Sequence, residues 1–141
     1  MAFATKTLRD DNIPTGAGSA GGLVVIRLDH SADSATSAAL DASGLSGHAN
    51  GAKLDITKIW WGLVQGTADD NTGYVQLQFK GASSDTTAIN LAGTGHYDGT
   101  AGKIENNATN TTATSGDLEL SAFGTSGYVL IELRKDESFT A

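Results

Sequence analysis

The fold of this 141-residue chain is decided by the stretch Tyr74-Val75-Gln76-Leu77-Gln78-Phe79-Lys80. Apolar and polar residues alternate in it without exception, so Val75, Leu77 and Phe79 share one face of an extended strand. Each side chain of this kind contributes roughly 1.5–3 kcal/mol when it is fully buried. The pattern therefore predicts a central strand of a sheet with one face in the core.

Two segments before this stretch also have strand character. Leu23–Leu28 is rich in β-branched residues and follows a glycine pair. Lys53–Val64 begins with clean alternation, but its phase changes near Thr57–Ile59. One extra residue at that point would move the apolar set to the other face, so we predict a β-bulge there.

Three segments after it continue the pattern. Thr86–Leu91 is a shorter candidate strand, and Asp117–Phe123 and Tyr128–Lys135 are alternating runs. The four residues Gly124–Gly127 separate the last two runs, which predicts a hairpin connection.

The segments between these runs are poor in large apolar residues. We interpret residues 30–51 as loop or weak strand, because serine and threonine weaken the case for a short helix over Ser34–Leu40. We interpret Gly93–Gly99 as a loop, and residues 106–116 as an exposed loop or edge strand. Six to eight short strands and no long helix predict an all-β fold, a β-sandwich or jelly-roll-like domain over residues 23–141.

Residues 1–22 differ from this domain. They hold few large apolar groups, include the single proline and end in a glycine-rich run. We therefore predict an extended N-terminal arm that is ordered by what it lies against, such as a neighbouring subunit. The arm residues that we expect to make such contacts are Phe3, Leu8, Ile13 and Pro14.

Composition excludes several classes of function. The chain has no cysteine, which removes disulfides, thiolate metal sites and a cysteine nucleophile. Its net charge is −7 and its few Lys and Arg residues are scattered along the sequence, so we expect no nucleic-acid partner. No run approaches the roughly 20 apolar residues of a membrane span, and the N-terminus lacks a signal-peptide pattern. We expect no membrane partner.

The sequence contains no strong motif for metal binding or for catalysis. His30, His48 and His96 lie far apart and lack metal-ligand spacing, which favours surface residues over a metal site. Asp69-Asp70-Asn71 is interpreted as an acidic turn, because it lacks the spaced ligands and the distal Glu of a calcium-binding loop. The glycine-flanked serines Ser46 and Ser126 do not fit a nucleophile elbow. We expect no cofactor and no enzymatic activity, and a hydrolase with an unfamiliar site is the third choice of function.

The dipeptide Trp60-Trp61 is the most informative one. Adjacent strand residues point to opposite faces, so one indole can enter the core while the other emerges on the outer face. An outward indole could stack on a sugar or on a neighbouring subunit. The alternative is that both indoles are covered within the monomer. We take both as candidate interaction residues.

The chain as a whole resembles the small decoration (cement) proteins of tailed bacteriophages. The resemblance lies in the arm of residues 1–22, the strands Lys53–Val64 and Tyr74–Lys80, and the closing stretch Gly124–Lys135. It implies a β-sandwich or jelly roll that forms a homotrimer on the outer capsid surface of the virion and clamps adjacent major capsid proteins. Such a protein would be made in the host cytoplasm.

A glycan- or receptor-binding module of a phage tail or an adhesin is the alternative. Its aromatic platform would combine Trp60 or Trp61 with Tyr74, Tyr97 or Tyr128. Under this alternative the outward indole contacts a ligand, whereas under the first it contacts a capsid protein.

Overall fold

The structure is a computed structural model of the chain, and its described part consists of eight segments. These are residues 3–11, 22–30, 34–40, 45, 53–65, 73–81, 85–107 and 117–135. Within them lie nine strands and no helix. The strands are β1 (Phe3–Asp10), β2 (Leu23–His30), β3 (Ser34–Leu40), β4 (Leu54–Gln65), β5 (Tyr74–Phe79), β6 (Thr86–Leu91), β7 (Thr94–Tyr97), β8 (Leu118–Phe123) and β9 (Thr125–Lys135).

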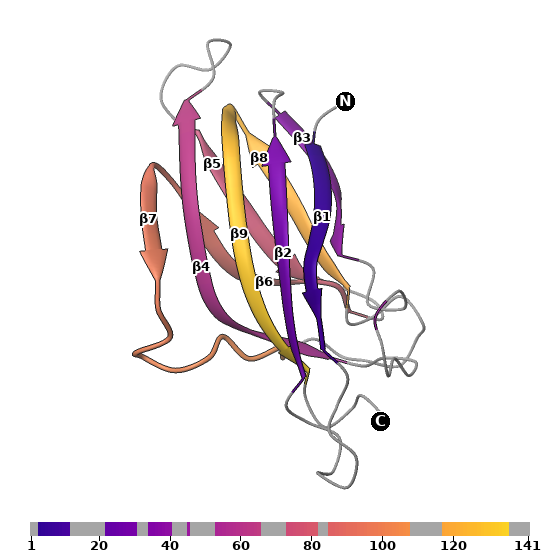
Figure 1. Cartoon of the computed structure of the whole chain (residues 1–141). Coiled ribbons are helices and arrows are strands. Elements are labelled where there is room, and N and C mark those ends of the chain that lie inside the picture. The colour runs from indigo at the N-terminus through magenta and orange to yellow at the C-terminus, as the bar shows by residue number, and fades with distance from the viewer. Residues whose placement is uncertain are drawn as a thin grey trace, which may run out of the picture.

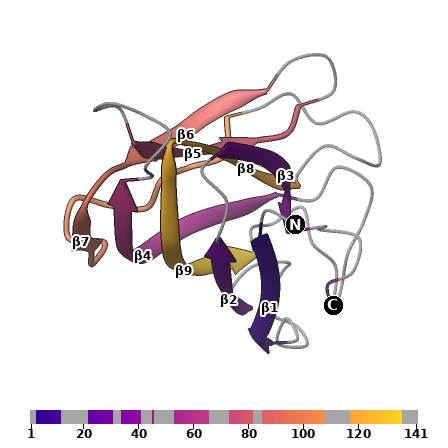
Figure 2. The ribbon, with the colours of Figure 1, turned by 90° about the horizontal axis from the view of Figure 1, so that it is seen from above.

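The strands form two stacked antiparallel sheets. The five-stranded sheet has the order β1-β2-β9-β4-β7, and the four-stranded sheet has the order β3-β8-β5-β6. Figure 1 shows the first sheet in front of the second, and Figure 2, seen from above, shows the two layers edge-on. The predicted all-β sandwich is confirmed. The core is the space between the layers.

Strand β5 lies where the alternation of its sequence predicts. It pairs with β8 on one side and β6 on the other, and Val75, Leu77 and Phe79 are buried between the sheets. The facing sheet contributes Ile26 from β2 and Ile131 from β9. The period of two thus decides both the inner face of each strand and the composition of the core.

The predicted bulge in β4 is confirmed. The register between β4 and β9 shifts between Ile56 and Lys58, so Thr57 is the extra residue. The Thr57 hydroxyl donates to the backbone carbonyl of Glu132 at 3.0 Å, which holds the bulge on its partner strand. Because of this shift Ile56 and Ile59 are both buried, although they are three positions apart.

The predicted hairpin between the last two runs is wrong. Strand β8 belongs to the four-stranded sheet and β9 to the five-stranded sheet, and Gly124 alone separates them. Gly124 has a φ of 59°, which a glycine adopts without steric cost, and the chain changes layers at this residue. Alternation shows which face of each run is apolar, but it does not show whether two consecutive runs pair with each other.

Two polar segments form strands. The glycine-rich stretch that we expected to be a loop contains β7, whose residues Thr94–Tyr97 pair with Gly62–Ile59 of β4. Four residues with little apolar content are too short to show a strand pattern, so the ladder with β4 decides their structure. Residues Ser34–Leu40 form β3, which agrees with the weak-strand interpretation and not with a helix. Residues 108–116 lie outside the described part.

The described part of the N-terminal segment is extended and lies on an edge of its own chain. Phe3–Asp10 forms β1, which pairs antiparallel with β2. Residues Ala4–Arg9 are all exposed, so the strand adds main-chain pairing and no core side chain over that range. Sequence analysis predicted an arm here because the segment has few large apolar residues, and the backbone hydrogen bonds of β1 do not require such residues. Residues 12–21 lie outside the described part.

Candidate functional site

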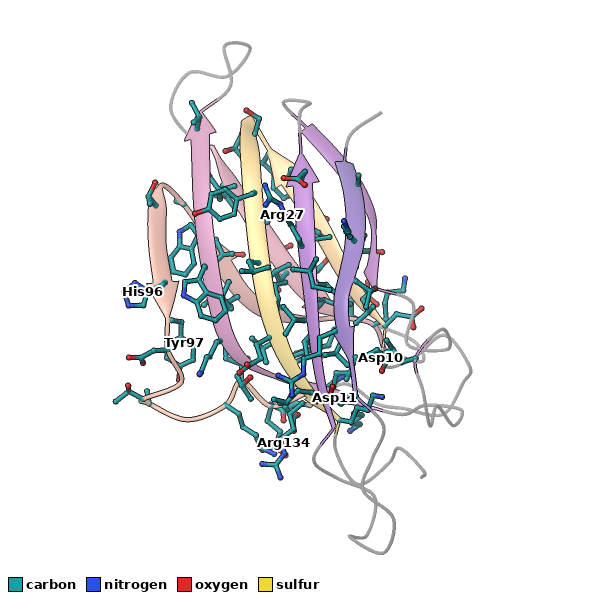
Figure 3. All side chains as sticks on the ribbon, viewed as in Figure 1. Asp10, Asp11, Arg27, His96, Tyr97 and Arg134 are labelled. Atoms are coloured by element: carbon teal, nitrogen blue, oxygen red, sulfur yellow. The ribbon has the colours of Figure 1, made fainter. Side chains whose placement is uncertain are left out.

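The outer face of the five-stranded sheet carries the candidate site. This face points away from the four-stranded sheet, and Figure 3 views the sheet from this side. Alternation along β4 and β9 places Trp60, Gly62, Tyr128 and Leu130 on it. Trp60 and Tyr128 are among the exposed large hydrophobic residues of the described chain, with exposed fractions of 36% and 39%. We call Trp60 and Tyr128, with Gly62 between them, the aromatic platform.

The two tryptophans separate as strand geometry requires. Trp61 packs against the core, and its indole Nε1 donates to the carbonyl of Ala92 at 2.9 Å. Trp60 lies on the other face of β4 and is exposed. The expectation of one inward and one outward indole is therefore met. Trp61 is half-buried against the core and Trp60 is exposed, so Trp60 is the interaction candidate of the two.

Two glycines allow two aromatic rings, those of Tyr128 and Trp61, to lie close to the backbone of the sheet. Gly62 lies opposite Tyr128 in the register, and a Cβ on Gly62 would come within 2.6 Å of the Tyr128 ring. The Tyr128 ring therefore rests on the backbone of β4, and 39% of the residue is exposed. On the inner face, a Cβ on Gly95 would come within 2.7 Å of the Trp61 ring. Each glycine is required by the close approach of an aromatic ring.

A charged pair borders the aromatic platform. Arg27 and Asp29 lie on β2, and the Arg27 guanidinium pairs with the Asp29 carboxylate at 3.2 Å. The Arg27 Cζ lies 5.9 Å from the centre of the Tyr128 ring, within the range of a cation–π contact. Asp29 lies opposite Tyr128 in the register of β2 and β9. Figure 3 shows Arg27 on the front of the sheet, beside β9.

A second feature fixes the N-terminal strand at the other end of the sheet. The Lys135 ammonium at the end of β9 is buried, and it donates to the Asp10 carboxylate at 2.6 Å and to the Asp11 carbonyl at 2.7 Å. We call these contacts the clasp. Arg9 holds the pKa of the neighbouring Asp11 carboxyl below its ordinary value by a side-chain hydrogen bond. Figure 3 shows Asp10 and Asp11 near the end of β1.

The arm residues that we predicted to make contacts are only partly described. Leu8 lies at an irregularity in the β1–β2 register and is 51% exposed. Phe3 lies in β1, but its side chain is outside the described part, and so are Ile13 and Pro14. The structure does not bring Leu8 to the aromatic platform, because β2 lies between β1 and the two strands of the platform, β9 and β4.

The other aromatic candidates lie elsewhere. Tyr74 stacks on Phe123 of the four-stranded sheet, with ring centres 4.8 Å apart. Tyr97 donates its hydroxyl hydrogen to the Gly102 carbonyl. Of the three tyrosines, Tyr128 alone shares the outer face with Trp60. Sequence reasoning did not find Gly62 or Arg27, because these residues meet Tyr128 only through strand pairing.

Within the part of the chain that the structure describes, no cluster of metal-ligating residues accompanies these features. In the described segments, no group of three or more His, Asp or Glu residues could hold a metal ion. His96 is exposed on β7, opposite Trp60, and Figure 3 shows it at the edge of the sheet. His48 and the side chain of His30 fall outside the described residues. Nor do the described segments contain a helix long and apolar enough to cross a membrane.

Comparison with known proteins adds no family. No protein-family model, curated protein or solved structure matches the chain. Function is therefore inferred from the residues and their geometry.

Proposed function

We propose that this chain is a viral structural protein, a capsid decoration subunit that binds adjacent major capsid proteins through its N-terminal strand. The observation that carries the proposal is the character of β1. Its side chains from Ala4 to Arg9 are exposed, yet its end is fixed by the buried Lys135 of the clasp. A strand that adds little to the core but is firmly attached presents its free edge and its side chains to another chain.

The position of β1 supports this role. It is the terminal strand of the five-stranded sheet, so one of its edges has no neighbour within that sheet. Exposed strand edges bind extended segments of other chains by adding a strand, and main-chain hydrogen bonds supply the affinity. Leu8 offers an apolar side chain beside that edge. Contacts of this kind stabilise a shell, because a ligand that binds the assembled state raises the stability of that state.

The test is to strip capsids of the protein and rebind its variants. Deletion of residues 2–20 is combined with Lys135→Met, since the deletion removes Asp10 and would leave the buried ammonium without that carboxylate. We expect this variant to keep its β-sheet circular dichroism and to lose capsid binding.

A point substitution provides a second readout. Leu8→Glu should weaken capsid binding, whereas the matched control Val64→Glu, at an exposed apolar residue of β4, should bind as the wild type does. If the deletion variant still saturates the shell, or if mass spectrometry does not find the chain in purified capsids, the proposal is wrong.

A further inference from the structure

We propose that the aromatic platform binds an uncharged carbohydrate, with a sugar ring stacked on Tyr128 and Trp60 beside it. This inference does not rest on the decoration role. It uses the middle of the five-stranded sheet, whereas the decoration role uses the edge strand β1. A ligand site here would function on a capsid, on a tail or on a free protein.

The Tyr128 ring is both exposed and supported from below. A tyrosine on the outside of a sheet usually stands among the Cβ atoms of the neighbouring strand. Here the neighbour is Gly62, and the ring occupies the space that a Cβ would fill. One face of the ring is supported by backbone while 39% of the residue is exposed. A supported, flat apolar surface of this kind fits the apolar face of a sugar ring.

Trp60 extends the surface along β4. Trp60 pairs with Leu130, and Tyr128 is two residues away on β9, so Trp60 and Tyr128 are diagonal neighbours on one face. Diagonal neighbours in an antiparallel pair lie roughly 7–8 Å apart, within reach of two aromatic side chains. Their polar tips can also donate hydrogen bonds, from the indole N–H and the phenol O–H. The two rings therefore offer adjacent stacking surfaces with hydrogen-bond donors at their rims.

The charges beside the rings select an uncharged ligand. Arg27 and Asp29 neutralise each other at 3.2 Å, and they present donors and acceptors together. A polyhydroxylated ligand can use both kinds of group without bringing a charge. A phosphate chain would instead meet the Asp29 carboxylate next to Tyr128. Complementarity of charge thus favours a neutral sugar over a nucleic acid.

The experiment is affinity electrophoresis of the full chain in native gels that contain a neutral polysaccharide. The probes are hydroxyethylcellulose, galactomannan and xylan, with single-stranded DNA and dextran sulfate as anionic comparisons. We expect at least one neutral polysaccharide to retard the wild-type protein. Tyr128→Ala should lower the affinity about tenfold, as loss of one stacked aromatic contact implies.

Two further variants make the test specific to the geometry. Gly62→Ala removes no aromatic ring but pushes the Tyr128 ring off the sheet, so it should weaken retardation as well. Phe123→Ala is the matched control, because Phe123 is 38% exposed on the four-stranded sheet, and it should leave retardation unchanged.

Three results overturn the inference. They are no retardation by any neutral polysaccharide, retardation by the anionic probes alone, and an equal loss of binding in the Phe123→Ala variant. None of them bears on capsid binding by the N-terminal strand, so failure of this inference and failure of the decoration role are distinguishable.

Discussion

The Lys135 ammonium lies 2.6 Å from the Asp10 carboxylate, and this pair joins the last residue of β9 to the last residue of β1. Lys135 is fully buried, whereas the Asp10 side chain is partly exposed. A buried ammonium must be neutralised by a partner or lose its charge. The attachment of the N-terminal strand is therefore coupled to the stability of the sandwich.

The clasp gives the first prediction. Asp10→Ala should destabilise the protein by about 3 kcal/mol, because removal of one partner leaves a buried charge poorly compensated. The double variant Asp10→Ala with Lys135→Met should recover most of this loss, since a methionine of similar length needs no counter-charge. Urea unfolding of the wild type and the variants measures both changes. Equal stabilities of Asp10→Ala and the wild type would contradict the coupling.

The second prediction concerns Gly127 in β9. Gly127 has a φ of 139°, and a Cβ on it would come within 2.1 Å of the Gly62 carbonyl oxygen, which belongs to rigid backbone. Gly93 also has a positive φ, of 63°, but a Cβ there meets no atom within 4 Å. Gly93→Ala should cost about 1 kcal/mol for its dihedral angle alone. Gly127→Ala should cost clearly more.

Thermal unfolding of these two alanine variants measures the difference. Similar melting temperatures for Gly127→Ala and Gly93→Ala would show that the β4 and β9 backbones can move apart without penalty, and would contradict the prediction.

The third prediction concerns acid stability. The Thr100 side chain and then its backbone N–H donate to Asp98, and these hydrogen bonds hold the pKa of the Asp98 carboxyl below its ordinary value of 3.8. A lowered pKa in the folded state contributes stability above the ordinary value, and that stability is lost as the pH falls through the folded-state pKa. Thr100→Ala should therefore raise the pKa of Asp98 toward 3.8 and reduce this part of the acid dependence.

Carboxyl chemical shifts followed by NMR titration test this point. The pKa of Asp11 provides the control, because its lowering comes from Arg9 and should not respond to Thr100→Ala. An unchanged pKa of Asp98 in the variant would mean that the hydroxyl hydrogen bond has no influence on it.

The faces of single strands could be predicted from the sequence, whereas the path of the chain between the two sheets could not. The alternation of apolar and polar residues in β5 predicts that Val75, Leu77 and Phe79 share one face. The phase change in β4 predicts the bulge at Thr57. Both are local patterns with a period fixed by strand geometry. The crossing at Gly124 has no such local signature, since the runs on either side look the same whether they pair together or enter different sheets.

The candidate site, too, was predictable from the sequence only in its local features. The sequence by itself determined that Trp60 and Trp61 face opposite sides of one strand, because successive side chains in a strand alternate. The tertiary structure alone decided that Trp60 is the outward one and that Tyr128, with Arg27 beside it, shares its face of the sheet. Trp60, Tyr128 and Arg27 come from three strands that are distant in sequence. The physical reason is that periodicity is a property of one strand, whereas register and sheet order result from burying all the apolar faces at once.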